Sequence, residues 1–194
     1  MKIVGITGGI GSGKTTVCKV FESLCIPVYY ADSAAKSLYT RDLTLKSQMI
    51  DSFGEAIFTQ NGLDKEKLAS IVFNDSEKLE TLNGLVHPAV KRDFESWLDE
   101  HQTSPYVIKE AAILIESGSY RDCNAIILVQ ANEEERIRRV CERDKVDRSL
   151  VLERIKNQMS EAEKANHADF FINNDPESKL IPQVLEIHSS ILNS

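Results

Sequence analysis

The stretch KIVGITGGIGSGKTTV at residues 2–17 limits the possible folds of this chain more than any other part of the sequence. Five of the nine glycines fall here, at positions 5, 8, 9, 11 and 13. Residues 8–15 fit the pattern GxxxxGK[ST], in which glycines let the backbone wrap around a phosphate with its N–H groups pointing inward. An apolar run precedes the pattern and a helical run follows it, so the helix adds the positive end of its dipole to the same place.

Two side chains of this loop have predicted roles. Lys14 supplies a positive charge for the β- and γ-phosphates, and Thr15 offers a hydroxyl that can ligate Mg²⁺. The plainer alternative is a glycine-rich turn between a strand and a helix, with a lysine that is merely solvated. The strand before the pattern and the unbroken helix after it favour phosphate binding. The sequence therefore predicts a nucleoside triphosphate as ligand, but the loop does not say where the phosphate goes.

Composition narrows the class of protein. With 194 residues, 42% of them hydrophobic, the chain resembles an ordinary soluble globular protein. The net charge of −7 argues against broad electrostatic binding to nucleic acid or to an anionic membrane. No stretch approaches the roughly 20 apolar residues of a spanning helix, and the first residues lack the features of a signal peptide. Because the four cysteines form no CxxC pair, we expect reduced thiols in a cytoplasmic enzyme rather than a zinc site or disulfides.

Apolar runs and helical patterns alternate over much of the chain, which predicts an α/β fold with a parallel sheet covered on both faces. The expected strands are residues 2–7, 26–30, 106–111, 124–130 and 169–173. The expected later helices are 132–143, 147–164 and 176–192, the last entered through Asp175 as cap and Pro176 in the first turn.

Residues 33–104 differ from the rest. They contain several helical patterns, for example residues 63–73 and 90–101, and no convincing strand. A helical insertion over the carboxyl end of the sheet is the economical interpretation, and continuous helices within one domain are the alternative.

Asp32 follows the second expected strand directly. The carboxyl ends of neighbouring parallel strands line a ligand crevice, where a carboxylate can orient an acceptor hydroxyl and take its proton. Capping of a helix that begins near Ser33 is an equally plausible role by position alone.

A second group of candidates is the arginines of residues 133–158. At about 100° per residue, Arg136, Arg139 and Arg143 share one helical face, whereas Arg138 points away. Such a row could close over a transferring phosphoryl group and neutralise its charge. Ion pairs along a solvated helix are the alternative, and the letters EEER make that plausible for Arg136.

Three further residues have no assigned role from spacing alone. Glu110 and Glu116 both follow apolar residues, but neither is a clear metal ligand. His87, followed by Pro88, is typical of a packed histidine at a helix boundary.

Two other classes of protein fit the sequence less well than a phosphotransferase does. The letters DSFG at residues 51–54 match the DxxG motif of regulatory GTPases, but the preceding residues are helical in character and no NKxD motif occurs. A nucleotide-binding module without chemistry is disfavoured because Asp32 and the arginine row suit transfer of a phosphoryl group.

These residues together resemble one family, the dephospho-coenzyme A kinases. The opening GITGGIGSGKTTV, the block IPVYYADSAAK and the helical blocks FGEAIFTQNGLDKEKLASIVFND and LNGLVHPAV are similar to the family's, as are AAILIESG, ERD and ADFFINND. The resemblance covers nearly the whole chain, and the helical blocks are not general features of phosphate-loop proteins.

The resemblance implies transfer of the γ-phosphoryl group of ATP to the ribose 3′-hydroxyl of dephospho-CoA, giving CoA and ADP, with Mg²⁺ as cofactor. It implies a P-loop kinase core with a five-stranded parallel sheet between helices, at residues 1–32 and 105–194. A helical acceptor-binding insertion would span residues 33–104, and a lid about residues 136–160. A nucleoside monophosphate kinase is the runner-up activity. ATP and dephospho-CoA are the expected partners of a cytoplasmic protein, for which a monomer is expected and an oligomer is the alternative.

The resemblance also implies roles for single residues. Asp32 becomes the general base, Lys14 and Arg143 act on the phosphates, and His87 becomes a substrate contact. The remaining implied contacts are Gly11, Ser12, Gly13, Lys14, Thr15 and Thr16 for the ATP phosphates, Asn173 and Asn174 for the adenine side, and Thr7 and Glu116 for the acceptor.

Two departures from the family pattern concern the acceptor pocket. The family often has DAD where this chain has Tyr30-Ala31-Asp32, and a Pro-Leu-Leu segment where it has Ala112-Ile113-Leu114. Both leave Asp32 in place.

Overall fold

The structure is a computed structural model, and it describes residues 1–60, 62–72 and 75–194. The chain divides into two compact units. The first consists of Met1–Tyr30 and His101–Ser194, and the second of Ala31–Glu100.

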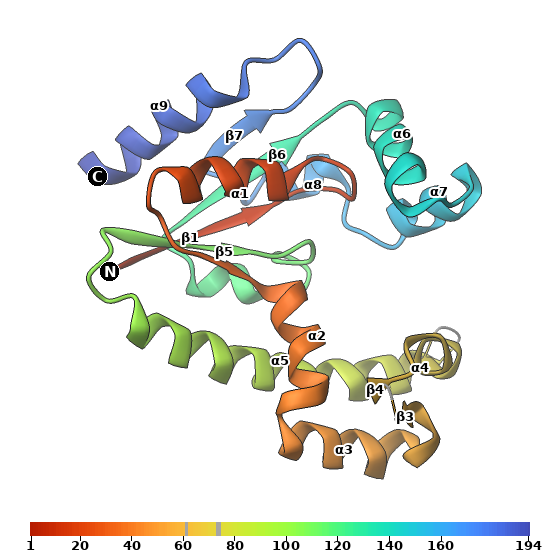
Figure 1. Ribbon diagram of the computed structural model, residues 1–194. Coiled ribbons are helices and arrows are strands. Elements are labelled where there is room, and N and C mark those ends of the chain that lie inside the picture. The colour runs from red at the N-terminus through yellow and green to blue at the C-terminus, as the bar shows by residue number, and fades with distance from the viewer. Residues whose placement is uncertain (61, 73–74) are drawn as a thin grey trace. The chain divides into compact units, whose positions relative to one another are not determined.

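A parallel sheet forms the centre of the first unit (Figure 1). Its strands are β1 (Lys2–Thr7), β2 (Val28–Tyr30), β5 (Tyr106–Glu110), β6 (Ala125–Gln130) and β7 (Phe170–Asn173). The spatial order is β2-β5-β1-β6-β7, and every neighbouring pair is parallel. The predicted α/β fold with five parallel strands is therefore confirmed. Because β5 lies between β1 and β2, the strand that leads to Asp32 is not the direct neighbour of the strand that leads to the glycine loop.

Two helices cover one face of this sheet, and Figure 1 shows them on the same side. They are α1 (Lys14–Ser23) and α9 (Leu180–Asn193). Val17 and Phe21, one helical turn apart on α1, are buried with Val184 and Ile187 of α9 against the strands. This core holds the start of α1, and with it the glycine loop, at the carboxyl end of β1.

The region expected to be the lid, about residues 136–160, falls on α6 (Glu133–Asp144) and α7 (Arg148–Lys156), and α8 (Glu161–Ala165) follows it. The single helix predicted at residues 147–164 is wrong, because the chain leaves the helix after Lys156 and starts again at Glu161. A capping box causes the restart: Glu163 N–H donates to Ser160 Oγ over 3.3 Å, and Ser160 N–H donates to Glu163 Oε2 over 2.9 Å.

The last helix, α9, begins at Leu180 rather than at residue 176. The predicted cap, Asp175, instead accepts a hydrogen bond from Asn132 N–H over 2.7 Å, at the start of α6. The proline of the first turn is Pro182, at a position where a backbone N–H has no partner within the helix.

The second unit has a separate hydrophobic core. Its elements are α2 (Ala31–Arg41), α3 (Leu43–Phe53), the 3₁₀ turn η1 (Glu55–Ile57), β3 (Phe58–Thr59), β4 (Gly62–Leu63), α4 (Lys65–Val72) and α5 (Ser76–Glu100). Leu45, Met49 and Ile57 are fully buried in this core. The letters DSFG mark the end of α3, where Gly54 has a φ of 87°. They do not form a GTPase switch.

Two expectations for this segment are wrong. β3 and β4 form a short antiparallel hairpin where no strand was expected. His87 and Pro88 lie inside α5 rather than at a helix boundary, because Val86 and Ala89 beside them are buried in the core of the unit. Phe73, the expected last residue of the helix at 63–73, lies outside the described residues. In the described part of the chain, no helix is both long and apolar enough to cross a membrane.

Candidate active site

The glycine loop, residues 8–13, joins β1 to α1, and its neighbours explain its glycines. A Cβ on Gly8 would lie 2.2 Å from the carbonyl oxygen of Val129. Gly11 has a φ of 80°, and a Cβ there would lie 2.4 Å from the carbonyl oxygen of Arg136. Gly13 has a φ of 92° and directly precedes α1. These distances leave no room for side chains, so the loop backbone can turn its N–H groups to a ligand.

Lys14 is buried and folds back over this loop. Its ammonium group donates hydrogen bonds to the carbonyl oxygens of Gly8, over 3.0 Å, and Gly9, over 3.4 Å. Thr15 and Thr16 follow in the first turn of α1, and both are exposed. A cation, two hydroxyls and the amino-terminal end of a ten-residue helix therefore meet at one place, which favours an anion.

Ser12 is fully buried in the middle of the loop. Among the described residues, its Oγ has no hydrogen-bond partner. Buried polar atoms without a partner are rare, so this hydroxyl is a candidate to bind a ligand. The Ser12 carbonyl oxygen, in contrast, accepts a hydrogen bond from Asn174 Nδ2 over 2.8 Å.

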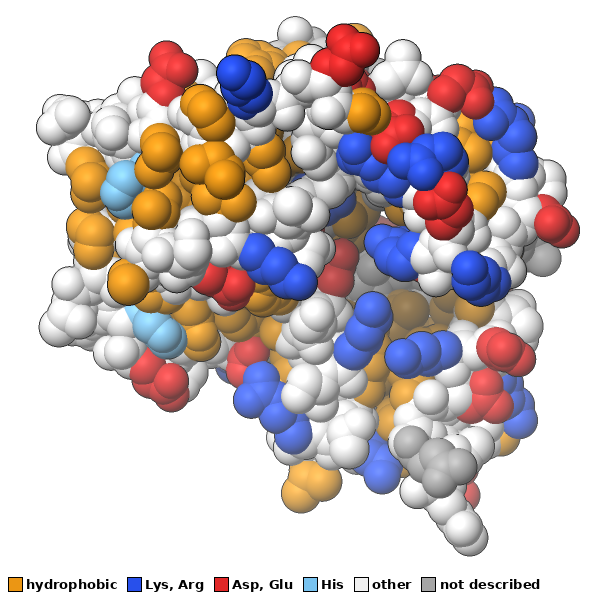
Figure 2. Space-filling view, turned by 45° about the horizontal axis from the view of Figure 1, so that its top comes forward, with side chains coloured by type: hydrophobic (Ala, Val, Ile, Leu, Met, Phe, Trp, Pro, Cys, Tyr) orange, Lys and Arg blue, Asp and Glu red, His pale blue; other side chains and the backbone are white. Residues whose placement is uncertain are grey.

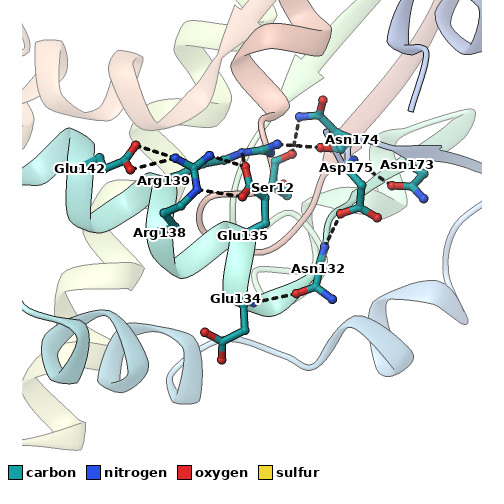
Figure 3. A network of polar contacts seen from close by, with 10 residues as sticks. All are labelled: Ser12, Asn132, Glu134, Glu135, Arg138, Arg139, Glu142, Asn173, Asn174 and Asp175. Carbon is teal, nitrogen blue, oxygen red and sulfur yellow. Dashed lines mark hydrogen bonds and ion pairs between the residues drawn. The ribbon is translucent and has the colours of Figure 1, made fainter. Parts of the chain in front are cut away.

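Asn173 is the last residue of β7 and Asn174 follows it, and Figure 3 shows both of them near Ser12 of the loop. Gln183 binds the backbone of Asn173 with its whole side-chain amide: Oε1 accepts from the Asn173 N–H, and Nε2 donates to its carbonyl oxygen, both over 2.9 Å. Asn174 joins the loop to α6, because its carbonyl oxygen accepts from the Arg139 guanidinium over 2.9 Å. These contacts place the segment after β7 directly against the phosphate loop.

The three arginines that were predicted to form one row have different surroundings in the structure. Arg136 is buried, and a Cβ on Gly9 would lie 1.9 Å from its guanidinium nitrogen, so Arg136 is in contact with the loop. Arg139 is bound to Glu135 over 2.8 Å and, through Asn174, to Ser12. The side chain of Arg143 is 64% exposed and donates to Asp144 over 2.7 Å. Its role at the phosphates stays a prediction.

Acidic side chains accompany the arginines along α6 and α7, as Figure 2 shows. Arg138 points to solvent, as predicted, and pairs with Glu135 and Glu142. The guanidinium groups of Arg138 and Arg139 lower the pKa of Glu135 to about 2. Arg136 pairs with Glu133 over 3.7 Å and with Glu161 over 3.5 Å, but it is buried and does not lie on the solvated helix face that the alternative interpretation of the letters EEER expected. Burial raises the pKa of Glu161.

Glu116 lies where the segment after β5 meets the region of α7 and α8. Its Oε1 accepts from the Met159 N–H over 3.1 Å and from the Lys164 ammonium over 2.9 Å. Lys164 has no exposed surface, and it also donates to the Ala112 carbonyl oxygen over 3.1 Å. The buried Thr7 Oγ1 donates to the same oxygen over 3.4 Å. In this structure Glu116 therefore holds two parts of the first unit together.

Asp32 and His87 belong to the second unit. Asp32 is exposed in the first turn of α2, which begins at Ala31, so it is not a cap preceding a helix at Ser33. His87 is half-buried in α5, and this burial lowers its pKa from the ordinary 6.5. The roles of both residues at an acceptor stay predictions.

Sequence reasoning missed Gln158 and Lys164. The Ile10 N–H, inside the loop, donates to Gln158 Oε1 over 2.9 Å. Neither residue belongs to a motif, and the polar letters around Lys164 suggest an exposed lysine. Only the capping box that begins at Ser160 could have indicated that the chain turns back to the core here.

Comparison with known proteins decides the family of the chain. A family model described as dephospho-CoA kinase matches residues 2–179. A dephospho-CoA kinase of Bacteroides fragilis is 39% identical over 184 residues, which cover 95% of this chain and 90% of that protein. The chain belongs to the dephospho-CoA kinase family. The resemblance inferred from the motifs is thereby confirmed, and the chain is an ATP-dependent kinase of coenzyme A biosynthesis.

Solved structures share the fold of this chain. A protein from Thermus thermophilus superposes with a TM-score of 0.88 at 34% identity, covering 97% of this chain and 96% of that one. A dephospho-CoA kinase from Campylobacter jejuni has a TM-score of 0.71 at 24% identity, covering 100% and 98%, and shares the fold.

Proposed function

We propose that this chain transfers the γ-phosphoryl group of ATP to the ribose 3′-hydroxyl of dephospho-CoA, giving CoA and ADP. The observation that carries the proposal is the glycine loop with its buried Lys14, in a chain that matches the family over residues 2–179. In the reaction, the ribose oxygen forms a bond to the γ-phosphorus. The bond from that phosphorus to the β–γ bridging oxygen breaks, and ADP leaves.

The loop supplies most of the ATP contacts in this proposal. The N–H groups from Gly11 to Thr16 bind phosphate oxygens. The ammonium group of Lys14, which rests on two loop carbonyls, turns to the β- and γ-phosphates. Asn173 and Asn174 hold the adenine side through the segment after β7. Arg143 neutralises charge on the transferring group, as its resemblance to the family's lid arginine suggests.

Mg²⁺ fits this site by the chemistry of its donors. The exposed hydroxyl of Thr15, directly after Lys14, is a hard oxygen ligand of the kind that Mg²⁺ prefers, together with phosphate oxygens and water. Bound there, the ion would neutralise phosphate charge during transfer.

The acceptor side rests on the second unit. Asp32 takes the proton of the 3′-hydroxyl as the new bond to phosphorus forms, and His87 contacts the acceptor. From the first unit, Thr7 and Glu116 complete the acceptor contacts. This assignment follows from the position of Asp32 after β2 and from the match of these residues to the family's blocks.

The chain acts in the cytoplasm as a monomer in this proposal. Its four cysteines are free thiols, which suits a reducing compartment.

A panel of acceptors tests the activity. The protein is incubated with MgATP and dephospho-CoA, AMP, shikimate or gluconate, and ADP release is followed. We expect turnover with dephospho-CoA alone. Phosphorylation of AMP without phosphorylation of dephospho-CoA would instead establish a nucleoside monophosphate kinase.

Asp32→Asn tests the base. Because loss of a general base typically slows catalysis about 10²- to 10⁴-fold, we expect kcat to fall by that amount. ATP affinity, measured by calorimetry, should change by less than about twofold, since Asp32 does not contact the phosphates in this scheme. Asp51→Asn, at an exposed aspartate of α3, is the matched control. Turnover of Asp32→Asn near the wild-type rate would rule Asp32 out as the base.

A further inference from the structure

The short segment between α7 and α8, residues 157–160, is bound to the core of the first unit by two successive residues. Gln158 Oε1 accepts the Ile10 N–H over 2.9 Å. The next residue, Met159, donates its own N–H to Glu116 Oε1 over 3.1 Å. Glu116 is in turn bound to the fully buried Lys164. This segment is therefore held in one position relative to the phosphate loop.

Ile10 contacts the same region with its side chain. It packs against a small hydrophobic cluster formed by Ile137, Val140 and Val151, which come from α6 and α7. A single loop residue thus touches the helices through its side chain and the α7–α8 segment through its backbone. The pattern GxxxxGK[ST] leaves this position open, so the motif does not explain the choice of isoleucine.

The glycines on either side of Ile10 also face α6. A Cβ on Gly9 would meet the Arg136 guanidinium, and a Cβ on Gly11 would meet the Arg136 backbone. The amino-terminal half of the loop therefore lies against α6. The part of the loop from Gly11 onward carries the N–H groups that the proposed function assigns to ATP.

We propose that Gln158 is a positioning residue for the phosphate-binding loop. Its amide oxygen holds the Ile10 N–H, and the Ile10 side chain anchors the loop to α6 and α7, so that the loop and these helices adopt one joint arrangement. The proposal rests on the proposed function only for the identity of the ligand, a nucleoside di- or triphosphate. Gln158 acts through the loop backbone and does not touch the phosphates.

Gln158→Met tests this coupling, because methionine has a similar length and lacks the amide oxygen. We expect the Ile10 amide to exchange with solvent at least about tenfold faster, as followed by NMR. We expect ATP and ADP to bind about tenfold more weakly, the effect of losing one hydrogen bond that shapes the site. Gln48→Met, at an exposed glutamine of α3, is the control and should change neither quantity.

A second variant separates loss of the bond from damage to the fold. Gln158→Glu keeps an acceptor oxygen at the same distance along the side chain, so the Ile10 amide should remain slow to exchange. Ile10→Ala keeps the N–H and removes the hydrophobic anchor, and it should weaken ATP binding as well. If Gln158→Met does not fold, these two variants provide the test.

Two outcomes would overturn the proposal. One is a wild-type exchange rate for the Ile10 amide in Gln158→Met. The other is fast exchange with unchanged affinity for ATP and ADP, which would make the hydrogen bond merely structural. Failure of the wild-type protein to bind either nucleotide would refute the proposed function instead, and the exchange of the Ile10 amide would still report on the coupling.

Discussion

At the scale of single residues, the glycines of the loop differ in which atoms lie next to them. Gly9 faces the tip of a side chain, the Arg136 guanidinium, whereas Gly11 faces the backbone of the same residue. A side chain can move to make room, but the first turn of α6 cannot do so without unwinding. Gly11 also has a φ of 80°, which an L-residue with a side chain adopts only under strain.

Gly11→Ala is therefore expected to damage the site. ATP binding, measured by calorimetry, should weaken by more than about tenfold, because the new Cβ pushes the loop off the Arg136 carbonyl. Gly84→Ala is the control: Gly84 lies inside α5 with open space around it, so the change should stabilise the protein by about 1 kcal/mol. Wild-type ATP affinity in Gly11→Ala would show that the loop has room for a side chain.

At the scale of elements, a fully buried lysine joins the region of α6 to α8 to the segment after β5. Lys164 of α8 has no exposed surface, and its ammonium group lies between the Glu116 carboxylate and the Ala112 carbonyl oxygen. The ion pair itself is weak evidence for stability, because Glu116 is exposed. Truncating the lysine is costly nonetheless, because its side chain is fully buried and donates to the Ala112 carbonyl oxygen.

Lys164→Ala should lower the free energy of unfolding by about 3 kcal/mol, because it leaves a cavity in place of a fully buried side chain and removes a donor to the Ala112 carbonyl oxygen. The measurement is urea denaturation followed by circular dichroism. Lys156→Ala changes an exposed lysine of α7 nearby and should cost less than about 0.5 kcal/mol. Equal stability of the two variants would contradict a structural role for the Lys164 pair.

At the scale of the whole molecule, two cores support two units. The core of the first unit holds the sheet, α1 and α9, and with them the glycine loop. The core of the second unit is built by its own helices and by Ile57. A cavity made in the second core should therefore leave the phosphate site intact.

Met49→Ala makes such a cavity, because Met49 is fully buried in the second core. We expect a loss of about 2–5 kcal/mol in the stability of that unit. ATP affinity should stay within about twofold of wild type, while the KM for dephospho-CoA rises, as the proposed acceptor role of residues 33–104 requires. Leu43→Ala, at a residue of α3 that is 76% exposed, is the control. An ATP affinity that falls as steeply as the stability would argue against separate roles for the units.

Much of the fold was predictable because its signals are local. The five strands are short apolar runs, and each was found within two residues of its expected bounds. The predicted helix bounds were wrong where a capping box or the burial of apolar side chains, and not the helical spacing of apolar residues, decided where a helix ends. The capping box at Ser160 divides one expected helix into α7 and α8. In α5, the burial of Val86 and Ala89 carries the helix through Pro88.

For the site, the order of residues along the chain was sufficient to identify the phosphate loop, since its glycines, Lys14 and Thr15 act within eight consecutive positions. Helical spacing grouped Arg136, Arg139 and Arg143, but which neighbours each would meet depends on contacts between residues far apart in the chain. Packing alone buried Arg136 against Gly9, enclosed Lys164 and brought Gln158 to Ile10, residues 148 positions apart. A periodic pattern records which face a residue occupies, and only the folded chain brings that face to a particular partner.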